Sequence, residues 1–378
     1  MQPAIDLLPG VDPNEAAIAH VLRRLTFGPH PGRAAALAAS TDAATVIEDL
    51  LADPADTGEP PPEIEENDPA GSLIRWYVRQ LANPAAGLHE RMCWYWHTHL
   101  TSSVDAASVD FMLQQHLLVR RHALGNFRTL LREITTDPAM LQFLDGDGSG
   151  GESPNENYAR ELMELFALGV GNYTEDDVRA AARALSGWGI EWDDATSYYW
   201  DDRGYDRPVT IFGERKRWDV DSVIDAVVEH EACAPHVAGR MWEHLVGTEL
   251  ADDRRGELAT VFRDADYEIL PLVAAIVRSP EFLESSGARA RTPLEWYIAA
   301  LVLTGQVVDD ELNEWELYAL GQVPFAPPNV AGWPLDDRWL SGSQYLLRAS
   351  TVLDHEVASS IINNVEPTVD AVARHCGV

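Results

Sequence analysis

Residues 145–156 combine residue types and a spacing that could hold a divalent cation. The segment fits the calcium-loop pattern, in which oxygen-bearing residues alternate around a turn glycine, here Gly150. A hard cation takes about six to eight oxygen ligands, and a tight loop can point alternate side chains inward. We therefore expect calcium or another divalent metal as a cofactor, with these predicted ligands: Asp145, Asp147, Ser149, Gly151 and Glu156.

The same loop also has an interpretation without a metal. Its eighth position normally carries an apolar residue that pairs with a neighbouring loop, but here it is Glu152, and the sequence holds no second copy of the loop. In this alternative a glycine-rich acidic surface loop ends at a helix. Asn155 then caps the helix, and Glu156 lies favourably near the positive end of the helix dipole.

The residues after the loop are expected to form an amphipathic helix over 156–168. Its polar residues recur at three- and four-residue spacing and share one face: Asn157, Arg160, Glu161 and Glu164. In one interpretation this face is solvated and Arg160 pairs with Glu164. In the other it is buried against imidazoles, so that its carboxylates have shifted pKa values and act as acid, base or metal ligand.

Three histidines could supply those imidazoles: His97, His99 and His122. Neutral imidazoles bind transition metals and act as general bases near neutral pH. Histidines at i and i+2 lie on different faces of a helix, so His97 and His99 converge only if the helix ends there, as the residues 101–103 (Thr-Ser-Ser) suggest. The alternative is that they are core histidines, bonded to backbone or carboxylate beneath a tryptophan cluster.

A proline-rich loop at 325–334 forms the last cluster with chemical potential. Consecutive prolines fix an extended backbone and Gly332 permits a turn, so Asn329 and Trp333 are presented rigidly. These two residues, with Asn155 and Asn157, are candidates for binding substrate. The loop equally suits a structural role in which Trp333 is buried and Asn329 satisfies backbone groups.

Composition limits the partners and the compartment. The 378 residues carry a formal charge of −33, and Lys216 is the single lysine beside 27 arginines. Such a chain repels nucleic acid phosphates and anionic membranes, so neither is expected as a partner. Three dispersed cysteines argue against a disulfide framework. The sequence shows neither a leader nor an apolar stretch of about 18 residues, which favours a cytoplasmic protein.

Helical periodicity dominates the chain. We expect a mainly α fold: one large irregular multi-helix domain over 1–378, with an N-terminal helical lobe at about 14–53, a proline- and acid-rich loop at 54–69, and a small β-hairpin excursion around 190–218, where aromatics and turns interrupt the pattern. The expected helices are 14–25, 33–39, 42–52, 72–81, 87–100, 109–124, 127–135, 137–144, 156–168, 175–186, 220–229, 234–246, 254–265, 270–278, 293–304, 310–320, 343–355 and 369–375.

Six motifs occur in an order that resembles the bacterial family catalogued as domain of unknown function number 1800. They are residues 22–28, 96–99, 121–127, 154–162, 185–188 and 327–334, and the resemblance runs from about residue 15 to about residue 350. The family has no assigned reaction to carry over, and many relatives are longer and exported. Relatives tend to carry a histidine–aspartate pair near 201–216, where this chain reads Asp201-Asp202-Arg203-Gly204. The resemblance favours a role for the His97–His99 and Asn155–Glu164 clusters, which lie within its motifs.

Two functions are consistent with these patterns. The first is a hydrolase acting on a small or polymeric polar substrate, with a carbohydrate favoured by the 12 tryptophans. A carboxylate of the 156–164 helix acts as general base, an imidazole or Arg160 stabilises negative charge, and a metal assists. The second is a non-catalytic scaffold, stabilised by calcium, that binds a protein partner.

Overall fold

The fold is known from a computed structural model, which describes residues 12–304 except 53, 55 and 57, and residues 314–351 except 336. The helices before the β excursion are α1 (Pro13–Leu25), α2 (Arg33–Ala38), α3 (Ala43–Ala52), α4 (Pro69–Ala82), α5 (Leu88–His99), α6 (Val109–His122), α7 (Phe127–Thr135), α8 (Pro138–Phe143), α9 (Asn157–Glu161), the π-helix η1 (Leu162–Ala167) and α10 (Glu175–Ala184). Those after it are α11 (Val220–Glu229), α12 (Cys233–Leu245), α13 (Asp252–Asp264), α14 (Ile269–Val277), α15 (Pro280–Glu284), α16 (Pro293–Thr304), α17 (Trp315–Leu320), the 3-10 helix η2 (Asp337–Leu340) and a helix over 342–351.

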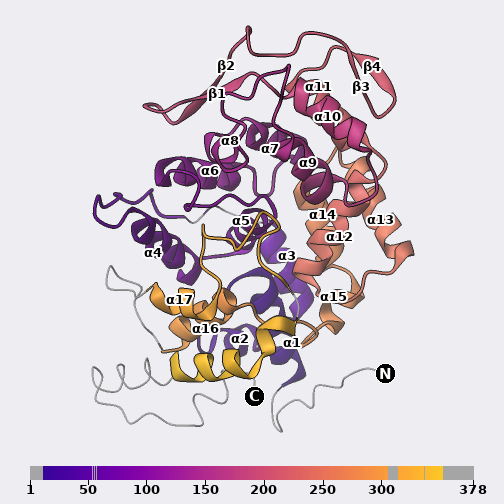
Figure 1. Cartoon of the computed structure of the whole chain (residues 1–378). Helices are drawn as coiled ribbons and strands as arrows, with labels where there is room; N and C mark the ends of the chain where they lie inside the picture. Colours follow the sequence, from indigo (N-terminus) through magenta and orange to yellow (C-terminus); the bar gives the residue numbers. More distant parts are fainter. Residues whose placement is uncertain are drawn as a thin grey trace.

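Between α10 and α11 the chain forms two separate antiparallel hairpins. Strand β1 (Trp188–Glu191) pairs with β2 (Thr196–Tyr199), and β3 (Val209–Ile211) pairs with β4 (Glu214–Lys216). Figure 1 shows both hairpins together at one end of the molecule, beyond α7, α8, α10 and α11. The prediction of a mainly α fold with a small β excursion is therefore confirmed, although the excursion contains two hairpins and begins at Trp188.

Capping residues explain where several helices begin. The Asp137 side chain accepts a hydrogen bond from Met140 N at 3.0 Å, and Pro138 occupies the first turn of α8, where its missing N–H costs nothing. At α10, Thr174 and Asp177 accept reciprocally from each other's backbone N–H. The short helix α15 was not expected from periodicity, but it begins in the same way, with Ser279 as its cap.

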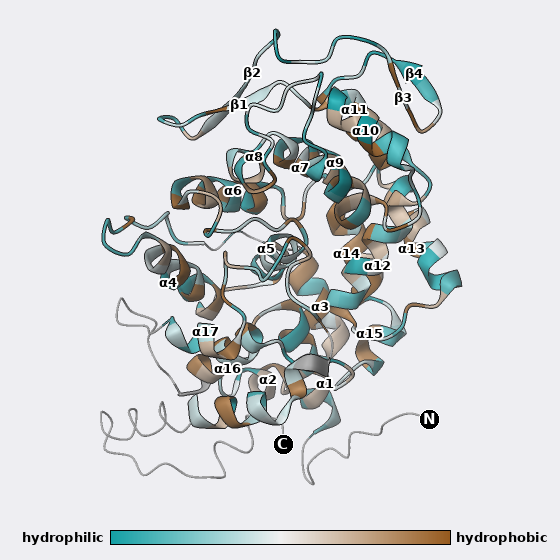
Figure 2. Ribbon diagram, in the orientation of Figure 1, coloured by the Kyte–Doolittle hydropathy of each residue, from teal (hydrophilic) through white to brown (hydrophobic). Residues whose placement is uncertain are grey.

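Two apolar cores hold the helices together. The larger joins α1, α3, α7, α10, η1 and α11–α14, and the smaller joins α4, α6, α16 and α17. Helix α5 contributes side chains to both cores, because Trp96 lies in the larger core and Trp94 in the smaller one. Figure 2 shows apolar stretches in the helices of this body and a hydrophilic β4. No helix in the described ranges is long and apolar enough to span a membrane.

Some predicted elements lie outside the described residues or differ in form. The helix expected at 310–320 is described from Trp315 onward, the one expected at 343–355 is described only to residue 351, and the one expected at 369–375 lies outside the described residues. The helix expected over 156–168 is split. Its first part is α9, and its second part is the π-helix η1, in which the hydrogen bonds span one more residue.

Candidate functional site

The polar side chains of the 145–156 loop are bonded to the protein itself. Asp147 Oδ1 accepts from Ile190 N at 3.1 Å, and Asp145 Oδ2 accepts from Asn157 Nδ2 at 3.3 Å. Ser149 Oγ accepts from Asn155 N at 2.9 Å. These contacts fasten the loop to β1 and to the start of α9, and they use oxygens that the calcium pattern assigned to a cation.

The remaining loop positions are also held by protein groups. Gly151 N donates to Arg203 O at 2.9 Å, and Glu156 pairs with Arg160 at 3.3 Å. Within 12–304 and 314–351, apart from the four positions excluded above, no group of three or more His, Cys, Asp or Glu residues is arranged to hold a metal. The calcium ligands therefore remain a prediction from the pattern.

His97 faces the smaller core. Its ring is 6% exposed, and its Nε2 accepts a hydrogen bond from Phe325 N at 3.0 Å. The ring stacks on Trp94 with centroids 5.5 Å apart. Burial lowers the pKa of His97 from 6.5 to about 3. The imidazole is thus neutral at physiological pH, and its accepting nitrogen is occupied by backbone, so it is poorly suited to act as a general base.

His99 faces the opposite way and caps the π-helix. Its Nε2 lies 2.9 Å from Phe166 O, and His236 Nε2 lies 2.9 Å from Leu165 O. The two rings thereby serve carbonyls at the end of η1, where the wider helical turn leaves acceptors without ordinary partners. Burial, followed by the charge of Arg240, lowers the pKa of His99 to about 3. Although α5 ends at His99, the rings of His97 and His99 contact different segments of the chain.

The acidic residues after the loop bond to other groups. Arg160 pairs with Glu156 and, at 2.7 Å, with Glu175, while Glu164 accepts from Tyr173 Oη at 2.7 Å. The expected Arg160–Glu164 pair is replaced by these contacts. Burial, followed by the charge of Glu164, raises the pKa of Glu161. His99 reaches this segment through the carbonyl of Phe166, so the contact is with backbone and not with a carboxylate.

The loop at 325–334 covers the end of α5. Trp333 is 5% exposed and lies against Trp94, with ring centroids 5.6 Å apart. A Cβ on Gly332 would come within 2.7 Å of Thr98 O, so only glycine allows this close approach. Asn329 Oδ1 accepts from Ala331 N at 2.9 Å and shapes the turn. Likewise, Asn155 Oδ1 accepts from Asn157 N at 2.7 Å. These contacts support the structural alternative for Asn329 and Trp333.

The third histidine, His122, lies beside a pocket that is formed by other elements than those around His97 and His99. His122 Nε2, at the end of α6, is 3.1 Å from Glu133 Oε1 on α7. Glu133 lines a pocket of about 310 Å³ formed by α7, the end of α10, the hairpin β1–β2 and the start of α11. The complete lining is Arg132, Glu133, Thr136, Ala184, Trp188, Tyr199, Trp218, Asp219, Val220 and Asp221.

One side of this pocket is aromatic. Trp188 and Tyr199 are cross-strand partners in the β1–β2 hairpin, and their rings meet edge to face with centroids 5.5 Å apart. Gly187 turns the chain into the hairpin at φ +94°, and a Cβ there would lie 2.8 Å from the Tyr199 ring. Trp218 contributes a third ring, held by its Nε1 hydrogen bond to Val209 O at 3.0 Å.

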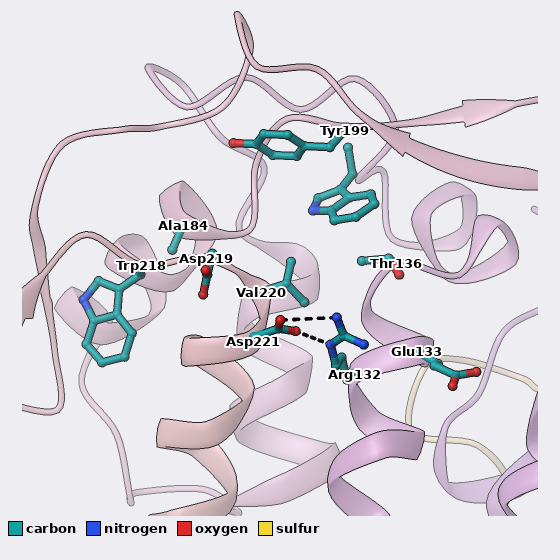
Figure 3. A pocket seen from close by; sticks show the side chains of 10 residues that line it. Arg132, Glu133, Thr136, Ala184, Tyr199, Trp218, Asp219, Val220 and Asp221 are labelled. Carbon is teal, nitrogen blue, oxygen red and sulfur yellow. Dashed lines mark hydrogen bonds and ion pairs between the residues drawn. The ribbon is translucent and has the colours of Figure 1, made fainter.

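The opposite side is charged. Arg132 on α7 forms an ion pair with Asp221 on α11, in which Arg132 Nη2 is 3.2 Å from Asp221 Oδ2 (Figure 3). Asp219 caps α11, accepting from Ser222 N at 2.9 Å, and these bonds with Ser222 lower the pKa of Asp219. Figure 3 shows the Arg132–Asp221 pair on the side of the cavity opposite Tyr199. The pocket thus joins apolar rings to ionised groups.

Most of this pocket was missed by sequence reasoning. Arg132 and Asp221 are 89 positions apart, and no local spacing relates them. Two signals did exist: Trp188 ends the 185–188 motif, and the aromatic excursion after it was noted as irregular. Of the predicted catalytic residues, His122 lies close to a residue that lines the pocket.

A comparison with protein-family models shows which family the chain belongs to. A model described as "Protein of unknown function (DUF1800)" matches residues 20–376, nearly the whole chain. The protein belongs to the DUF1800 family. The match confirms the resemblance seen in the six motifs, including the 185–188 motif that leads into the pocket. Comparisons with curated proteins and with solved structures gave no match.

Proposed function

We propose that this DUF1800 protein binds a neutral, polyhydroxylated ligand such as a saccharide in the pocket between α7, α11 and the β1–β2 hairpin. The proposal rests on the lining of this cavity of about 310 Å³, which combines aromatic rings with charged hydrogen-bonding groups. Sugars present C–H faces that pack on aromatic rings and hydroxyls that bond to carboxylates and guanidinium groups. The volume is at the lower end of the usual ligand-pocket range of about 300–1,000 Å³.

Charge favours a neutral ligand over an acidic one. The lining holds three acids, Glu133, Asp219 and Asp221, and one base, Arg132. Because acids outnumber bases here and the whole chain carries −33, an anionic sugar would be repelled. Arg132 is already paired with Asp221, so its remaining donors are suited to hydroxyl oxygens.

Hydrolysis is the second candidate, because a specific contact favours it. His122 lies 3.1 Å from Glu133, which lines the pocket. In this proposal Glu133 acts as the general base on a water, and His122 lies at ion-pair distance from the carboxylate, although its Nε2 makes no hydrogen bond to a described residue. This differs from the predicted use of His97 and His99, whose rings are buried against backbone. Arg160, Glu161 and Glu164 take no part in it.

In the alternative of a non-catalytic scaffold, the 145–156 loop would support the pocket wall. Gly148 N donates to Trp188 O at 2.9 Å, and Gly187 N donates to Ser149 O at 2.9 Å. The loop can therefore brace the hairpin that presents Trp188 and Tyr199. Elemental analysis of the purified protein, before and after dialysis against a chelator, tests whether a divalent metal takes part in this support.

Ligand binding is tested by titrating the protein with soluble oligosaccharides of glucose, mannose and N-acetylglucosamine, followed by tryptophan fluorescence and calorimetry. Tyr199→Ala removes an exposed ring from the wall. With roughly 50 Å² of apolar contact at ~25 cal/mol per Å², the loss should weaken binding about tenfold. Tyr318→Ala is the matched control, because Tyr318 on α17 is equally exposed, at 46%.

A further variant, Glu133→Gln, distinguishes ligand binding from hydrolysis. Glu133→Gln should leave saccharide affinity within about threefold of the unaltered protein if the site only binds, and should abolish product release if Glu133 is the base. If none of the oligosaccharides binds, or if Tyr199→Ala and Tyr318→Ala weaken binding equally, the pocket is not the saccharide site.

A further inference from the structure

Three arginines lie close together in the helical body, on elements that Figure 1 places away from the two hairpins. Arg24 lies on α1, Arg91 on α5, and Arg289 in the segment that precedes α16. Glu295, on α16, is the carboxylate that contacts Arg91 and Arg289. The side chains of Arg91, Arg289 and Glu295 are only 2%, 5% and 5% exposed. These four residues are called the arginine cluster below.

Two of the three arginines find acceptors at helix ends. Arg91 donates to Arg23 O at 2.9 Å and to Thr26 O at 2.6 Å, at the C-terminus of α1, and it also pairs with Glu295. Arg24 donates to Leu245 O at 2.6 Å and to the neighbouring His244 O at 2.5 Å, at the C-terminus of α12. Helix C-termini carry partial negative charge, so they suit guanidinium groups.

Arg289 lacks such partners. Its Nη2 donates to both carboxylate oxygens of Glu295, at 2.7 and 2.9 Å. Its Nε and Nη1 are buried and have no hydrogen-bond partner among the described residues. An ionised donor that is removed from water without an acceptor is costly, so buried charged groups are normally paired. Within the cluster, Arg289 is therefore the arginine that lacks hydrogen-bond acceptors.

The arginine cluster also lacks negative charge. Three arginines against one glutamate leave two positive charges in the cluster. Burial, followed by the charge of Arg289, lowers the pKa of Arg24 well below its ordinary value. Beside Arg24, both ring nitrogens of His244 are buried without a hydrogen-bond partner in the described part of the chain. This excess occurs in a chain whose overall charge is −33.

We propose that the arginine cluster binds a small oxyanion through a free N–H donor of Arg289, on Nε or on Nη1, which lie on different edges of the guanidinium plane. Guanidinium groups favour the oxygens of phosphate and carboxylate, and a bound anion would supply a missing acceptor and the missing negative charge. The site is separate from the saccharide pocket, since the two share no residue. Either a free inorganic anion or the oxyanion group of a small metabolite has the required chemistry.

Thermal unfolding in phosphate and in chloride of equal ionic strength tests the site. Phosphate at about ten times its dissociation constant should raise the Tm of the unaltered protein about 2 °C above the chloride value. Arg289→Gln should abolish this difference. Arg278→Gln, which removes an exposed arginine paired with Glu48, should retain it. Equal Tm values in phosphate and chloride for the unaltered protein would overturn the proposal, as would loss of the effect in both variants.

Phosphorus NMR of inorganic phosphate with the unaltered protein keeps the proposal falsifiable if Arg289→Gln does not fold. Saturable line broadening that acetate does not compete away indicates a phosphate site, and competition by acetate or citrate indicates that carboxylates are accepted as well. Absence of saturable broadening refutes oxyanion binding. Tyr199→Ala should leave the broadening unchanged, so this result is independent of the saccharide proposal.

Discussion

Replacing His97 by glutamine should remove a pH dependence that the buried ring confers on folding. The ring is 6% exposed, accepts from Phe325 N, and has a pKa lowered by burial from 6.5 to about 3. Glutamine keeps an acceptor of similar reach but does not titrate. The variant therefore isolates the protonation of this one side chain from the many other groups that titrate in an acidic protein.

The size of the effect follows from proton uptake. Below pH 6.5 the unfolded chain binds a proton at His97 that the folded chain does not bind until about pH 3. The stability contributed by the neutral ring is therefore complete above pH 6.5 and is lost as the pH falls. Each pH unit corresponds to about 1.4 kcal/mol. Between pH 7 and pH 5, the free energy of unfolding should fall about 2 kcal/mol more for the unaltered protein than for His97→Gln.

Urea unfolding followed by tryptophan fluorescence at pH 7, 6 and 5 measures this difference. His99→Gln should behave in the same way, because the pKa of His99 is also about 3 and a glutamine amide can still donate to Phe166 O. The double variant should show about 4 kcal/mol. Parallel stability curves for the unaltered protein and His97→Gln would show that the folded protein protonates His97 as readily as the unfolded chain, and the assignment of this ring as a buried, neutral structural group would fail.

Three further substitutions test the structure by urea unfolding. Burial raises the pKa of Asp137 from 3.8 to about 7, so the folded state loses stability as the pH rises from 3.8 to 7. Asp137→Asn should remove about 4 kcal/mol of that loss. An unchanged pH profile would contradict the raised pKa of Asp137. Gly187→Ala should cost about 1–3 kcal/mol more than Gly213→Ala, because both have positive φ but only Gly187 would meet the Tyr199 ring; equal costs would exclude crowding as the cause. Glu295→Gln should cost about 3–5 kcal/mol by leaving two arginines without their carboxylate, and a neutral result would mean that the ion pairs are solvated.

Local chemistry made the helices predictable. Asp137 followed by Pro138, and Thr174 followed by Asp177, are caps whose hydrogen bonds involve residues within three positions, and helices α8 and α10 begin at them. The π-helix was not visible in the same way. Its form depends on carbonyl acceptors that are met by His99 and His236, which come from distant helices. Periodicity therefore predicted a helix after residue 156 but not the change in its hydrogen bonding.

Contacts that depend on tertiary packing could not be predicted from the sequence. The spacing of His97 and His99 suggested joint chemistry, yet the helix continues through both, so their rings face Phe325 and Phe166 on different sides. The pocket draws Arg132 from α7 and Asp221 from α11, and nothing in either helix marks the other as its partner. Sequence patterns report residue types within an element, whereas the convergence of elements is set by the cores that pack them.

The origin of the two pocket walls has a consequence for specificity. Arg132 is carried by a helix of the body, whereas Trp188, Tyr199 and Trp218 belong to the stretch that leaves the body after α10 and returns at α11. Substitutions at Trp188 and Tyr199 can therefore remodel what the cavity accepts, provided that Ile190, Val209, Ile211 and Trp218, which pack into the two cores, are kept. A chimaera that exchanges only this stretch between two members of the family would transfer ligand preference as a module.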